Sequence, residues 1–505
     1  MRIATFCAAL MVSVAATAQK TVSTKTINEF DSYVDQVMKE WDVPGLAIAV
    51  VKDGKVLLKK GYGVRELGKA GAVDTQTLFS CASTTKAMTS LVLGMLVDEG
   101  KLDWDDPVNK YIPELRLHDP YITRELRVRD LLIHNSGLGS TDYFWSVADF
   151  TWQEMIEKLI HVESSYSFRG GFEYQNTMYM IAGVVIERIT GKNWNDVMME
   201  RLFKPLKMTG TVPDRVLSNT ANITRPHYPV KGEIKIIDYD KSTRIGAAGG
   251  VWSNVDDMSK WLLTLLDSGK YEGGRLVKAS TFRELFKPQT IAPDNEYPTF
   301  SVLKPHWVTY GMGWFQIDYR GKMVNFHTGS LSGLTAIIGL LQEEKFGVYV
   351  FGNYDHAEVR HAIMYKAFDH FVLGNGRDWN AEFKKLYASL REAHEKRVAE
   401  FENDRVANTK TSLPLDAFEG EYSSEIYGTA RVTVVNNSLR FDVNNGFLTA
   451  DLPHWHYDTF YGRAGEVGQY TMFATFSIGA DGKVEKVNLD GLEFTKTPVT
   501  SKPSP

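Results

Sequence analysis

Three short segments carry side chains suited to acyl transfer, and the first pairs a serine with a lysine. It is Ser83-Thr84-Thr85-Lys86, at the start of a helix predicted over residues 83–99. Residues three apart lie on one helix face, about one turn from each other. A serine hydroxyl is a weak nucleophile until a base removes its proton. Lys86 precedes a mainly apolar stretch, where burial disfavours the ammonium form, so its amine can act as that base.

The second segment is Tyr174-Gln175-Asn176. A tyrosine beside a lysine can pass a proton between nucleophile and leaving group, and the nearby cation is expected to favour its phenolate. Asn176 can both donate and accept hydrogen bonds, so it suits contact with Lys86 and with a substrate amide or ester oxygen.

The third segment is His327-Thr328-Gly329-Ser330, at the end of a predicted strand. Gly329 is expected to let a ligand approach the strand backbone closely. The backbone N–H of Ser330 could then pair with that of Ser83 as an oxyanion hole. His327 is expected near the Tyr174 hydroxyl, where it would tune that group.

The elements that must position these segments are strands at both ends of a long helical stretch. Residues 45–62 predict a hairpin about an Asp53-Gly54 turn, and the predicted helix over 83–99 is apolar on most sides, as expected of a central, buried helix. Further helical patterns occur near 152–163, 176–190, 194–203 and 255–268, and strands return between 310 and 353. This order predicts an α+β fold, with an antiparallel sheet flanked by helices and a separate helical region.

The remainder of the chain predicts a second body. Residues 378–412 are charged and helical in pattern, which is typical of a helical linker. After Leu413-Pro414-Leu415 the pattern becomes short strands with Gly and Asn-Asn turns, which predicts a small all-β barrel domain over 413–505. The catalytic domain is thereby expected to span residues 19–377.

Composition and the N-terminus bound the class of protein. The 505 residues carry a formal net charge of -5 and no basic run suited to nucleic acid, and no transmembrane segment is expected after the first 20 residues. Residues 1–18 match a secretory signal peptide cut before Gln19, which predicts export to a bacterial periplasm or cell surface. Cys81 is then the single cysteine, and we interpret it as a small buried residue, not a nucleophile.

The order and spacing of the three segments resemble a known family. Tyr174 lies 91 positions after Ser83, and His327 lies a further 153 on. Residues 25–375 are thereby similar to the serine β-lactamase and penicillin-binding superfamily, in the branch of class C β-lactamases, D-aminopeptidases and related esterases. Three further stretches support the resemblance: Val43-Pro44-Gly45-Leu46, Leu131 to Leu138, and Ala248-Gly249-Gly250-Val251-Trp252-Ser253.

The resemblance implies an active site at the junction of an α/β sandwich and a helical region. By position, Ser83 would be the nucleophile, Lys86 the base, Tyr174 the proton shuttle and Asn176 a substrate contact. His134, although a tempting base, would be structural support. The tail resembles a β-barrel often appended to such hydrolases, and its His454-x-His456 pair shows no third ligand for a metal. Acyl transfer through Ser83 requires neither a metal nor an organic cofactor, so none is expected.

One departure from the family pattern bears on the substrate. Dedicated β-lactamases and transpeptidases usually carry lysine where this chain has His327, and histidine is largely neutral near pH 7. We therefore expect weak or no β-lactam turnover, and cleavage of a small-molecule ester, amide or peptide, as in an esterase or a D-amino-acid peptidase or amidase. Two alternatives stay open: an acyltransferase with an alcohol or amine acceptor, and a penicillin-recognising sensor with negligible turnover. The oligomeric state is also left open.

Overall fold

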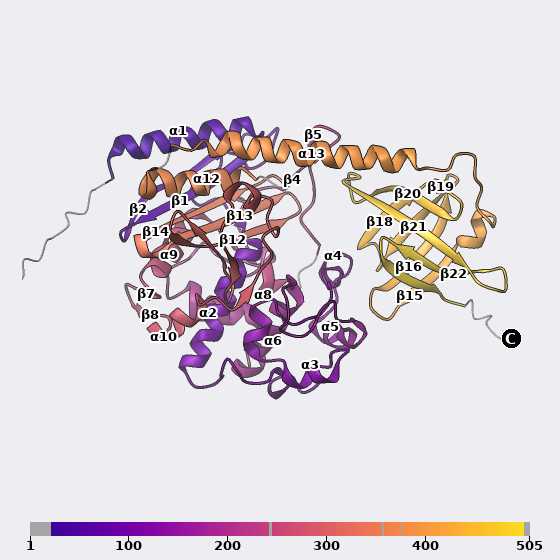
Figure 1. Ribbon diagram of the computed structural model, residues 1–505, viewed down its shortest axis with the longest axis horizontal. Coiled ribbons are helices and arrows are strands. Elements are labelled where there is room, and N and C mark those ends of the chain that lie inside the picture. The colour runs from indigo at the N-terminus through magenta and orange to yellow at the C-terminus, as the bar shows by residue number, and fades with distance from the viewer. Residues whose placement is uncertain (1–21, 242–244, 356–357, 375, 499–505) are drawn as a thin grey trace, which may run out of the picture.

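The computed structural model describes residues 22–241, 245–355, 358–374 and 376–498 (Figure 1). The predicted signal peptide over residues 1–18 lies outside this range. A larger body holds the three predicted segments, a long helix leaves it, and a β-barrel follows at the far end (Figure 1).

The larger body is built on one antiparallel sheet of eight strands in the order β2-β1-β14-β13-β12-β11-β10-β9. The predicted hairpin is confirmed as the first two strands, and the return to strands after residue 310 is confirmed as well. The bounds are β1 (Gly45–Lys52), β2 (Lys55–Gly63), β9 (Thr290–Ile291), β10 (Val308–Tyr310), β11 (Phe315–Tyr319), β12 (Lys322–Leu331), β13 (Leu334–Leu341) and β14 (Phe346–Gly352).

Both faces of the sheet are covered, which is why its central strands are apolar at almost every position. Successive side chains of a strand point to opposite faces. In β1, Ala47 and Ala49 belong to one core, shared with the central helix. Leu46 and Ile48 belong to a second core, shared with helices from the beginning and the end of the sequence of the larger body. Those helices are α1 (Thr24–Glu40), α12 (Val359–Phe368) and the first turns of α13 (Trp379–Asn403).

The other face carries the helical region and the remaining short elements. The helices are α2 (Thr85–Asp98), α3 (Pro120–Glu125), α4 (Tyr143–Ser146), α5 (Trp152–Lys158), α6 (Asn176–Thr190), α7 (Trp194–Met198), α8 (Gly246–Gly249), α9 (Val255–Leu266) and α10 (Ala279–Leu285). Helix α11 (Phe300–Leu303) lies on the opposite face, where Phe300 joins the second core. The short strands are β3 (Phe79–Ser80), β4 (His227–Val230), β5 (Glu233–Ile236), β6 (Trp252–Ser253), β7 (Lys270–Tyr271) and β8 (Gly274–Arg275).

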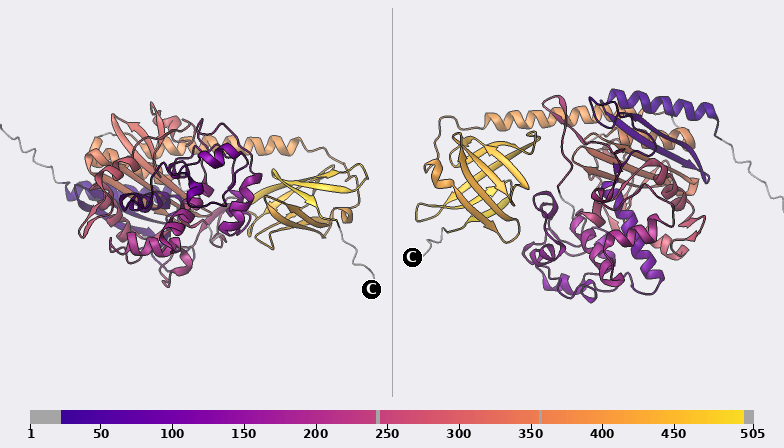
Figure 2. Two further views of the ribbon diagram at one scale, coloured as in Figure 1. Left: turned by 90° about the horizontal axis from the view of Figure 1, so that it is seen from below. Right: turned by 180° about the vertical axis from the view of Figure 1, so that it is seen from behind.

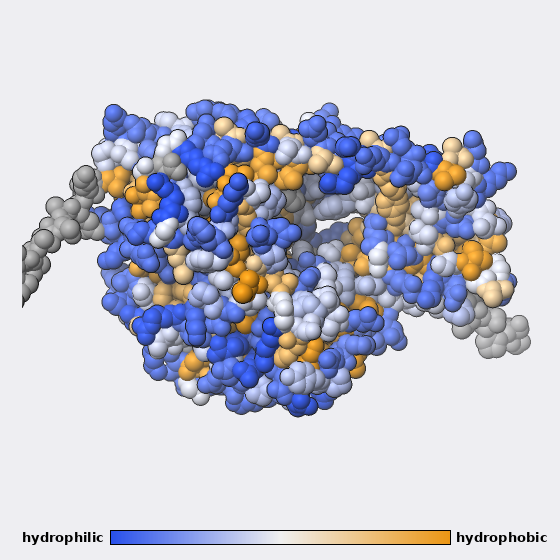
Figure 3. Space-filling model, viewed as in Figure 1, coloured by the Kyte–Doolittle hydropathy of each residue, from blue (hydrophilic) through white to orange (hydrophobic). Residues whose placement is uncertain are grey.

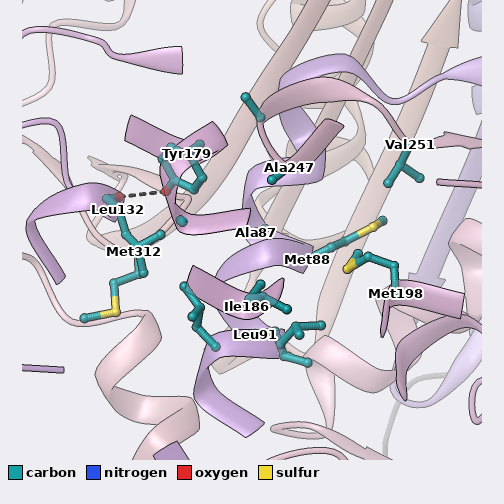
Figure 4. Packing of buried hydrophobic residues seen from close by; sticks show 14 of the residues in the cluster. Ala87, Met88, Leu91, Leu132, Tyr179, Ile186, Met198, Ala247, Val251 and Met312 are labelled. Atoms are coloured by element: carbon teal, nitrogen blue, oxygen red, sulfur yellow. Dashed lines mark hydrogen bonds between the residues drawn. The ribbon is translucent and has the colours of Figure 1, made fainter. Parts of the chain in front are cut away.

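Helix α2 is the central, buried helix that the sequence predicts. Every residue from Thr85 to Leu96 is buried. Met88 and Leu91 pack among side chains of α6 and α7 (Figure 4). The prediction placed the helix start at residue 83, whereas Ala82–Thr84 form a separate 3-10 turn before α2. Ser83 therefore lies on a tight turn at the helix entrance.

The C-terminal body is a closed, all-antiparallel barrel of eight strands, as the α+β-plus-barrel prediction requires. Strands follow the order β18-β17-β16-β15-β23-β22-β21-β20, and pairing of β18 with β20 closes the ring. The bounds are β15 (Gly420–Ser424), β16 (Gly428–Val435), β17 (Ser438–Val443), β18 (Leu448–Leu452), β19 (His454–His456), β20 (Thr459–Ala464), β21 (Tyr470–Ile478), β22 (Val484–Leu489) and β23 (Leu492–Lys496).

The linker predicted over residues 378–412 contains the whole of α13, whose first turns pack on the larger body and whose far half runs on to the barrel (Figure 2). The strand that holds His454 and His456 packs against it, since the Trp455 ring stacks on Phe401 at 5.2 Å between centroids. Beneath α13 the surface is hollowed between the two bodies, and below this hollow the bodies meet (Figure 3).

Candidate active site

Ser83 lies on a strained turn between β3 and α2. Ala82, just before it, has a φ of 44°, in the left-handed region that residues other than glycine rarely adopt. Buried hydrogen bonds hold this conformation: Ala82 N donates to Ser80 Oγ at 3.1 Å, and Cys81 N donates to the Val251 carbonyl at 2.8 Å. The turn leaves Ser83 half-buried between buried neighbours, so its hydroxyl reaches the space between sheet and helical region.

Lys86 is fully buried beneath this turn, and its Nζ has three close partners. These are Ser83 Oγ at 3.0 Å, Asn176 Oδ1 at 2.7 Å and the Ala248 carbonyl at 2.9 Å. Burial lowers the pKa of Lys86 to about 7, while the Asp142 carboxylate acts in the opposite direction. Near neutral pH a large fraction of Lys86 is therefore the free amine.

The partners of Lys86 determine where its lone pair points. A neutral amine has two N–H donors and one lone pair. The amide oxygen of Asn176 and the carbonyl of Ala248 only accept, so they take the two N–H groups. The lone pair then faces Ser83 Oγ, the one partner with a proton to give. The arrangement suits proton abstraction from Ser83.

Tyr174 stands over Lys86, with the ammonium nitrogen 4.8 Å from its ring centroid. The expectation that the cation favours a phenolate is wrong. Burial raises the pKa of Tyr174 well above its usual value, and the interaction with the Ser83 hydroxyl offsets this only in part. Tyr174 is neutral at physiological pH, which suits it to donate a proton to a leaving group.

His134 holds Tyr174 from behind. Gln175 N donates to His134 Nδ1 at 3.0 Å, and Glu173 N donates to the His134 carbonyl at 3.0 Å, so both neighbours of Tyr174 are fixed. The His134 ring also packs on the Tyr174 ring at 4.3 Å between centroids. Burial lowers the pKa of His134 well below its usual value, which keeps it neutral. These contacts favour the structural support that the resemblance implies.

His327 lies deeper in the site than the sequence indicated. Its Nε2 pairs with the Tyr310 hydroxyl at 2.9 Å and its Nδ1 with the Thr328 carbonyl at 2.6 Å, so neither nitrogen bonds to Tyr174. Burial, aided by the charge of Lys86, lowers the pKa of His327 to about 3. The ring is neutral, as expected near pH 7, but it is fully buried and supports the strand instead of offering a nitrogen to a substrate.

Gly329 brings β12 into backbone contact with the nucleophile turn. A Cβ at this position would overlap the carbonyl oxygen of Cys81 and lie 3.1 Å from Ser83 N. The close neighbour is thus the chain's own backbone, whereas a ligand was expected. Beside it Thr328 Oγ1 bonds to the Tyr297 hydroxyl at 2.8 Å, and Ser330 is exposed at the site.

The peptide between Gly329 and Ser330 is fixed by a buried cation. Arg360 of α12 donates to the Gly329 carbonyl at 2.5 Å and to Ser330 Oγ at 3.0 Å. Because a trans peptide is planar, the Ser330 N–H points away from that carbonyl. Arg360 thereby orients the N–H that would complete an oxyanion hole with Ser83 N.

Gly329→Ala is expected to lower kcat/KM roughly 100-fold, because the added methyl group displaces the nucleophile turn by a fraction of an ångström. Steady-state kinetics on an activated ester, with thermal unfolding measured in parallel, checks this. The matched control is Gly376→Ala, where no atom lies within 4 Å of the added Cβ. Unchanged kinetics in Gly329→Ala would contradict the backbone contact described above.

A small pocket adjoins the nucleophile turn. Gly249 belongs to its wall and lies close to the Ala82 backbone, since a Cβ there would be 3.5 Å from the Ala82 carbonyl carbon. The other lining residues are mainly aromatic and aliphatic, with three charged residues among them: Trp145, Asp214, Arg215, Val216, Tyr239, Asp240, Ile245, Gly250, Trp252, Leu331 and Leu334. An apolar or aromatic acyl group fits these walls.

Sequence reasoning missed two charged residues of the site, Asp142 and Arg360. Asp142 stands in a loop without a motif, so nothing in its spacing pointed to Lys86. Arg360 had a detectable signal, because it stands in the mainly apolar stretch Val359–Phe368, where a buried arginine needs partners. Cys81 is buried beside the nucleophile, and burial raises its pKa to about 12, so it is no thiolate.

The described residues hold neither a cluster of metal ligands nor a membrane-spanning helix. In the part of the chain that the structure describes, no group of three or more His, Cys, Asp or Glu side chains is placed to hold a metal ion. Within the same residues, no helix is both long and apolar enough to span a membrane.

The fold and the site together define a class: a Ser-Lys-Tyr cluster between an antiparallel sheet and a helical region. The family model described as Beta-lactamase matches residues 30–369, which is most of the larger body. The chain belongs to this family, within the serine β-lactamase and penicillin-binding superfamily, and is an enzyme of the serine hydrolase type. A second model, a domain of unknown function (DUF3471), matches residues 404–501, which contain the barrel.

The chain is similar to several curated proteins at low identity. Unguisins hydrolase ungD' of Aspergillus campestris is 26% identical over 390 residues, covering 72% of this chain and 70% of the relative. Unguisins hydrolase ungD of Aspergillus violaceofuscus is 26% identical over 454 residues, covering 82% and 77%. Protein flp of Staphylococcus aureus is 24% identical over 335 residues, covering 64% and 62%.

Two solved structures share the fold. The octameric penicillin-binding protein homologue from Pyrococcus abyssi has a TM-score of 0.58 at 21% identity, covering 93% of this chain and all of that one. The structure of SurE has a TM-score of 0.55 at 17% identity, covering 94% and 99%.

Proposed function

We propose that this protein cleaves an ester or amide through an acyl-enzyme on Ser83. The observation that carries the proposal is the contact of buried Lys86 Nζ with Ser83 Oγ and with the acceptors of Asn176 and Ala248, from which the direction of its lone pair follows. No metal or organic cofactor is needed for this chemistry.

In the acylation step, Lys86 takes the proton of Ser83, and Ser83 Oγ forms a bond to the substrate carbonyl carbon. The negative charge that develops on the carbonyl oxygen is stabilised by the N–H groups of Ser83 and Ser330. The C–O or C–N bond to the leaving group then breaks, and the leaving group takes a proton from the neutral Tyr174 hydroxyl, which is replenished from Lys86. In deacylation, water forms a bond to the acyl carbon as Lys86 takes its proton. The bond from that carbon to Ser83 Oγ then breaks, and Ser83 Oγ regains the proton from Lys86 as the acid is released.

The substrate class follows from the charges and the cavity. His327 stands where dedicated β-lactamases usually carry a lysine. Because it is neutral and buried, it offers no positive charge to hold a substrate carboxylate. This favours esters and amides, the latter including D-amino-acid peptides, over β-lactams. Two relatives named as hydrolases of unguisins support hydrolysis as the overall reaction. The adjoining cavity favours an apolar or aromatic acyl group.

Trapping of the acyl-enzyme tests the proposal. The full chain is incubated with a fluorophosphonate, a p-nitrophenyl ester and D-amino-acid amides, and intact and peptide masses are recorded. We expect the label on the peptide that contains Ser83, with steady release of product from the ester. Labelling of another residue would overturn the proposal. A single burst without turnover would favour a sensor, and ester product formed with an added alcohol would favour acyl transfer.

The cellular site and domain limits complete the proposal. We propose that residues 1–18 direct export to a bacterial periplasm or cell surface and are then removed. The mature chain would comprise a catalytic domain over 19–377, a linker over 378–412 and a barrel over 413–505. The run of α13 from the larger body to the barrel supports these divisions.

A further inference from the structure

Asp142 is a carboxylate at the edge of the Lys86 network that the reaction described above does not use. Its Oδ1 accepts a hydrogen bond from Asn176 Nδ2 at 2.8 Å and another from Trp145 Nε1 at 3.0 Å. The first bond connects Asp142 to the base through one side chain. The second ties it to a residue that lines the cavity beside the nucleophile.

The bond to Asp142 decides which way the Asn176 amide faces. An amide can rotate by half a turn, which exchanges its oxygen and nitrogen. A carboxylate only accepts, so it selects the orientation in which Nδ2 faces Asp142 and Oδ1 faces Lys86. In the opposite orientation an N–H group would face Lys86 Nζ, compete for its lone pair and draw it away from Ser83. Asp142 thereby keeps the base directed at its proton donor.

Asp142 supplies the negative charge that acts on Lys86, because the other titratable groups around Lys86 are neutral. Burial holds two histidines neutral and four tyrosines protonated: His134, His327, Tyr174, Tyr179, Tyr297 and Tyr310. The charge of Asp142 raises the pKa of Lys86 against the effect of burial. Loss of the Asp142 charge is therefore expected to lower the pKa of Lys86.

The segment that carries Asp142 is also where the barrel docks. The rings of Tyr143 and Tyr427 meet edge to face, with centroids 4.5 Å apart. Asn444 Nδ2 of the barrel donates to the Val147 carbonyl at 2.9 Å. On α5, Lys158 Nζ donates to the Glu425 carbonyl at 2.8 Å. Residues 142–150 are thus held between the active site and the barrel.

From this geometry we propose that Asp142 is a positioning residue of the acyl-transfer site, and that the barrel, by clamping residues 143–150, holds it in place. The proposal rests on the function proposed above, and it gives the appended domain a part in setting the base. The barrel would act at a distance from the reacting atoms, through Asp142 and Asn176.

The variant Asp142→Asn, made in the full chain, tests whether Asp142 is a positioning residue. We expect kcat/KM at pH 8 to fall roughly 10- to 100-fold through loss of alignment. Because the opposing charge is gone, the acidic limb of the pH–kcat/KM profile moves to lower pH by about 1 unit. A uniform loss of activity with an unmoved limb would mean a purely structural role and would overturn the proposal.

A second measurement is independent of turnover. The titration of Lys86 is followed by NMR of ¹³C-labelled lysine side chains, with its signal assigned by its absence from Lys86→Met. A midpoint that is lower in Asp142→Asn than in wild type supports the proposal even if no tested ester is a substrate, and an equal midpoint overturns it. Failure of the proposed function appears separately, as wild-type protein in which Ser83 takes no label.

Tyr427→Ala tests the second half of the proposal. We expect kcat/KM to fall several-fold, with the acidic limb displaced in the same direction as in Asp142→Asn. The matched control is Tyr457→Ala, an exposed barrel tyrosine (57% of its surface is accessible). Tyr143→Ala and the double variant complete a cycle, in which the contact predicts non-additive losses. Additive losses, or wild-type kinetics in Tyr427→Ala with a folded barrel, would overturn the role of the barrel.

Discussion

The Ser83→Ala variant is expected to lose between about 10³- and 10⁶-fold in kcat on an activated ester, because the acyl-enzyme is proposed to form on the hydroxyl that this change removes. Its fold should be unaffected, since Ser83 is half-buried and its hydroxyl contributes one hydrogen bond to Lys86. The loss is measured by steady-state hydrolysis, and the covalent step by fluorophosphonate labelling.

A nearby serine supplies the control for this variant. Ser90 lies about two turns further along α2 and is fully buried, and it has no part in the proposed reaction. Ser90→Ala should keep its label on Ser83 and most of its activity. Turnover and labelling that persist in Ser83→Ala would remove Ser83 from the mechanism, whatever the control shows.

Lys86→Met is expected to lower kcat/KM roughly 10²- to 10⁴-fold, the usual contribution of a positioned general base. Methionine keeps much of the volume of the buried chain without its amine. In wild type, kcat/KM should rise with pH through about 7, the pKa to which burial lowers Lys86. The variant should lack this rise, because its residual activity no longer depends on an amine. A wild-type limb far from pH 7 would contradict the assignment of Lys86 as the base.

The same substitution should change how stability depends on pH. Between pH 7 and 10.5 the unfolded chain binds a proton at Lys86 that the folded chain does not, so the wild-type free energy of unfolding rises with pH in this window. Below pH 7 Lys86 is protonated in both states, and the full cost of burying its charge lowers the free energy of unfolding. As pH falls from 10.5 to 7, the free energy of unfolding of Lys86→Met should rise relative to that of wild type by on the order of 5 kcal/mol. Urea unfolding at several pH values measures this difference, and parallel curves for both proteins would refute it.

Much of the fold follows from local pattern. The alternation of Ala47 and Ala49 with Leu46 and Ile48 appears in the sequence as one apolar strand, and its burial on both faces explains that pattern. The Asp53-Gly54 turn and the apolar helix after Lys86 are likewise local signals. Several barrel strands were less evident, because strands such as β19 and β23 are short and gain their order from cross-strand pairing.

The site was predictable as a set of residues and only partly as a geometry. Ser83, Lys86, Tyr174 and Asn176 lie within reach of one another, as their ordered motifs indicated. The sequence also indicated a neutral His327, since an imidazole has a usual pKa near neutrality and burial can only lower it further.

Only the tertiary structure decided the electrostatics and the orientation of these groups. Whether Tyr174 is a phenol or a phenolate depends on how completely it is buried, and burial raises its pKa well above the usual value. Asp142 and Arg360 reach the site from outside the three motifs, so the spacing of the motifs does not place them there. The sequence alone determined which side chains can transfer a proton. Long-range packing decided which of them is charged, and where the lone pair of Lys86 points.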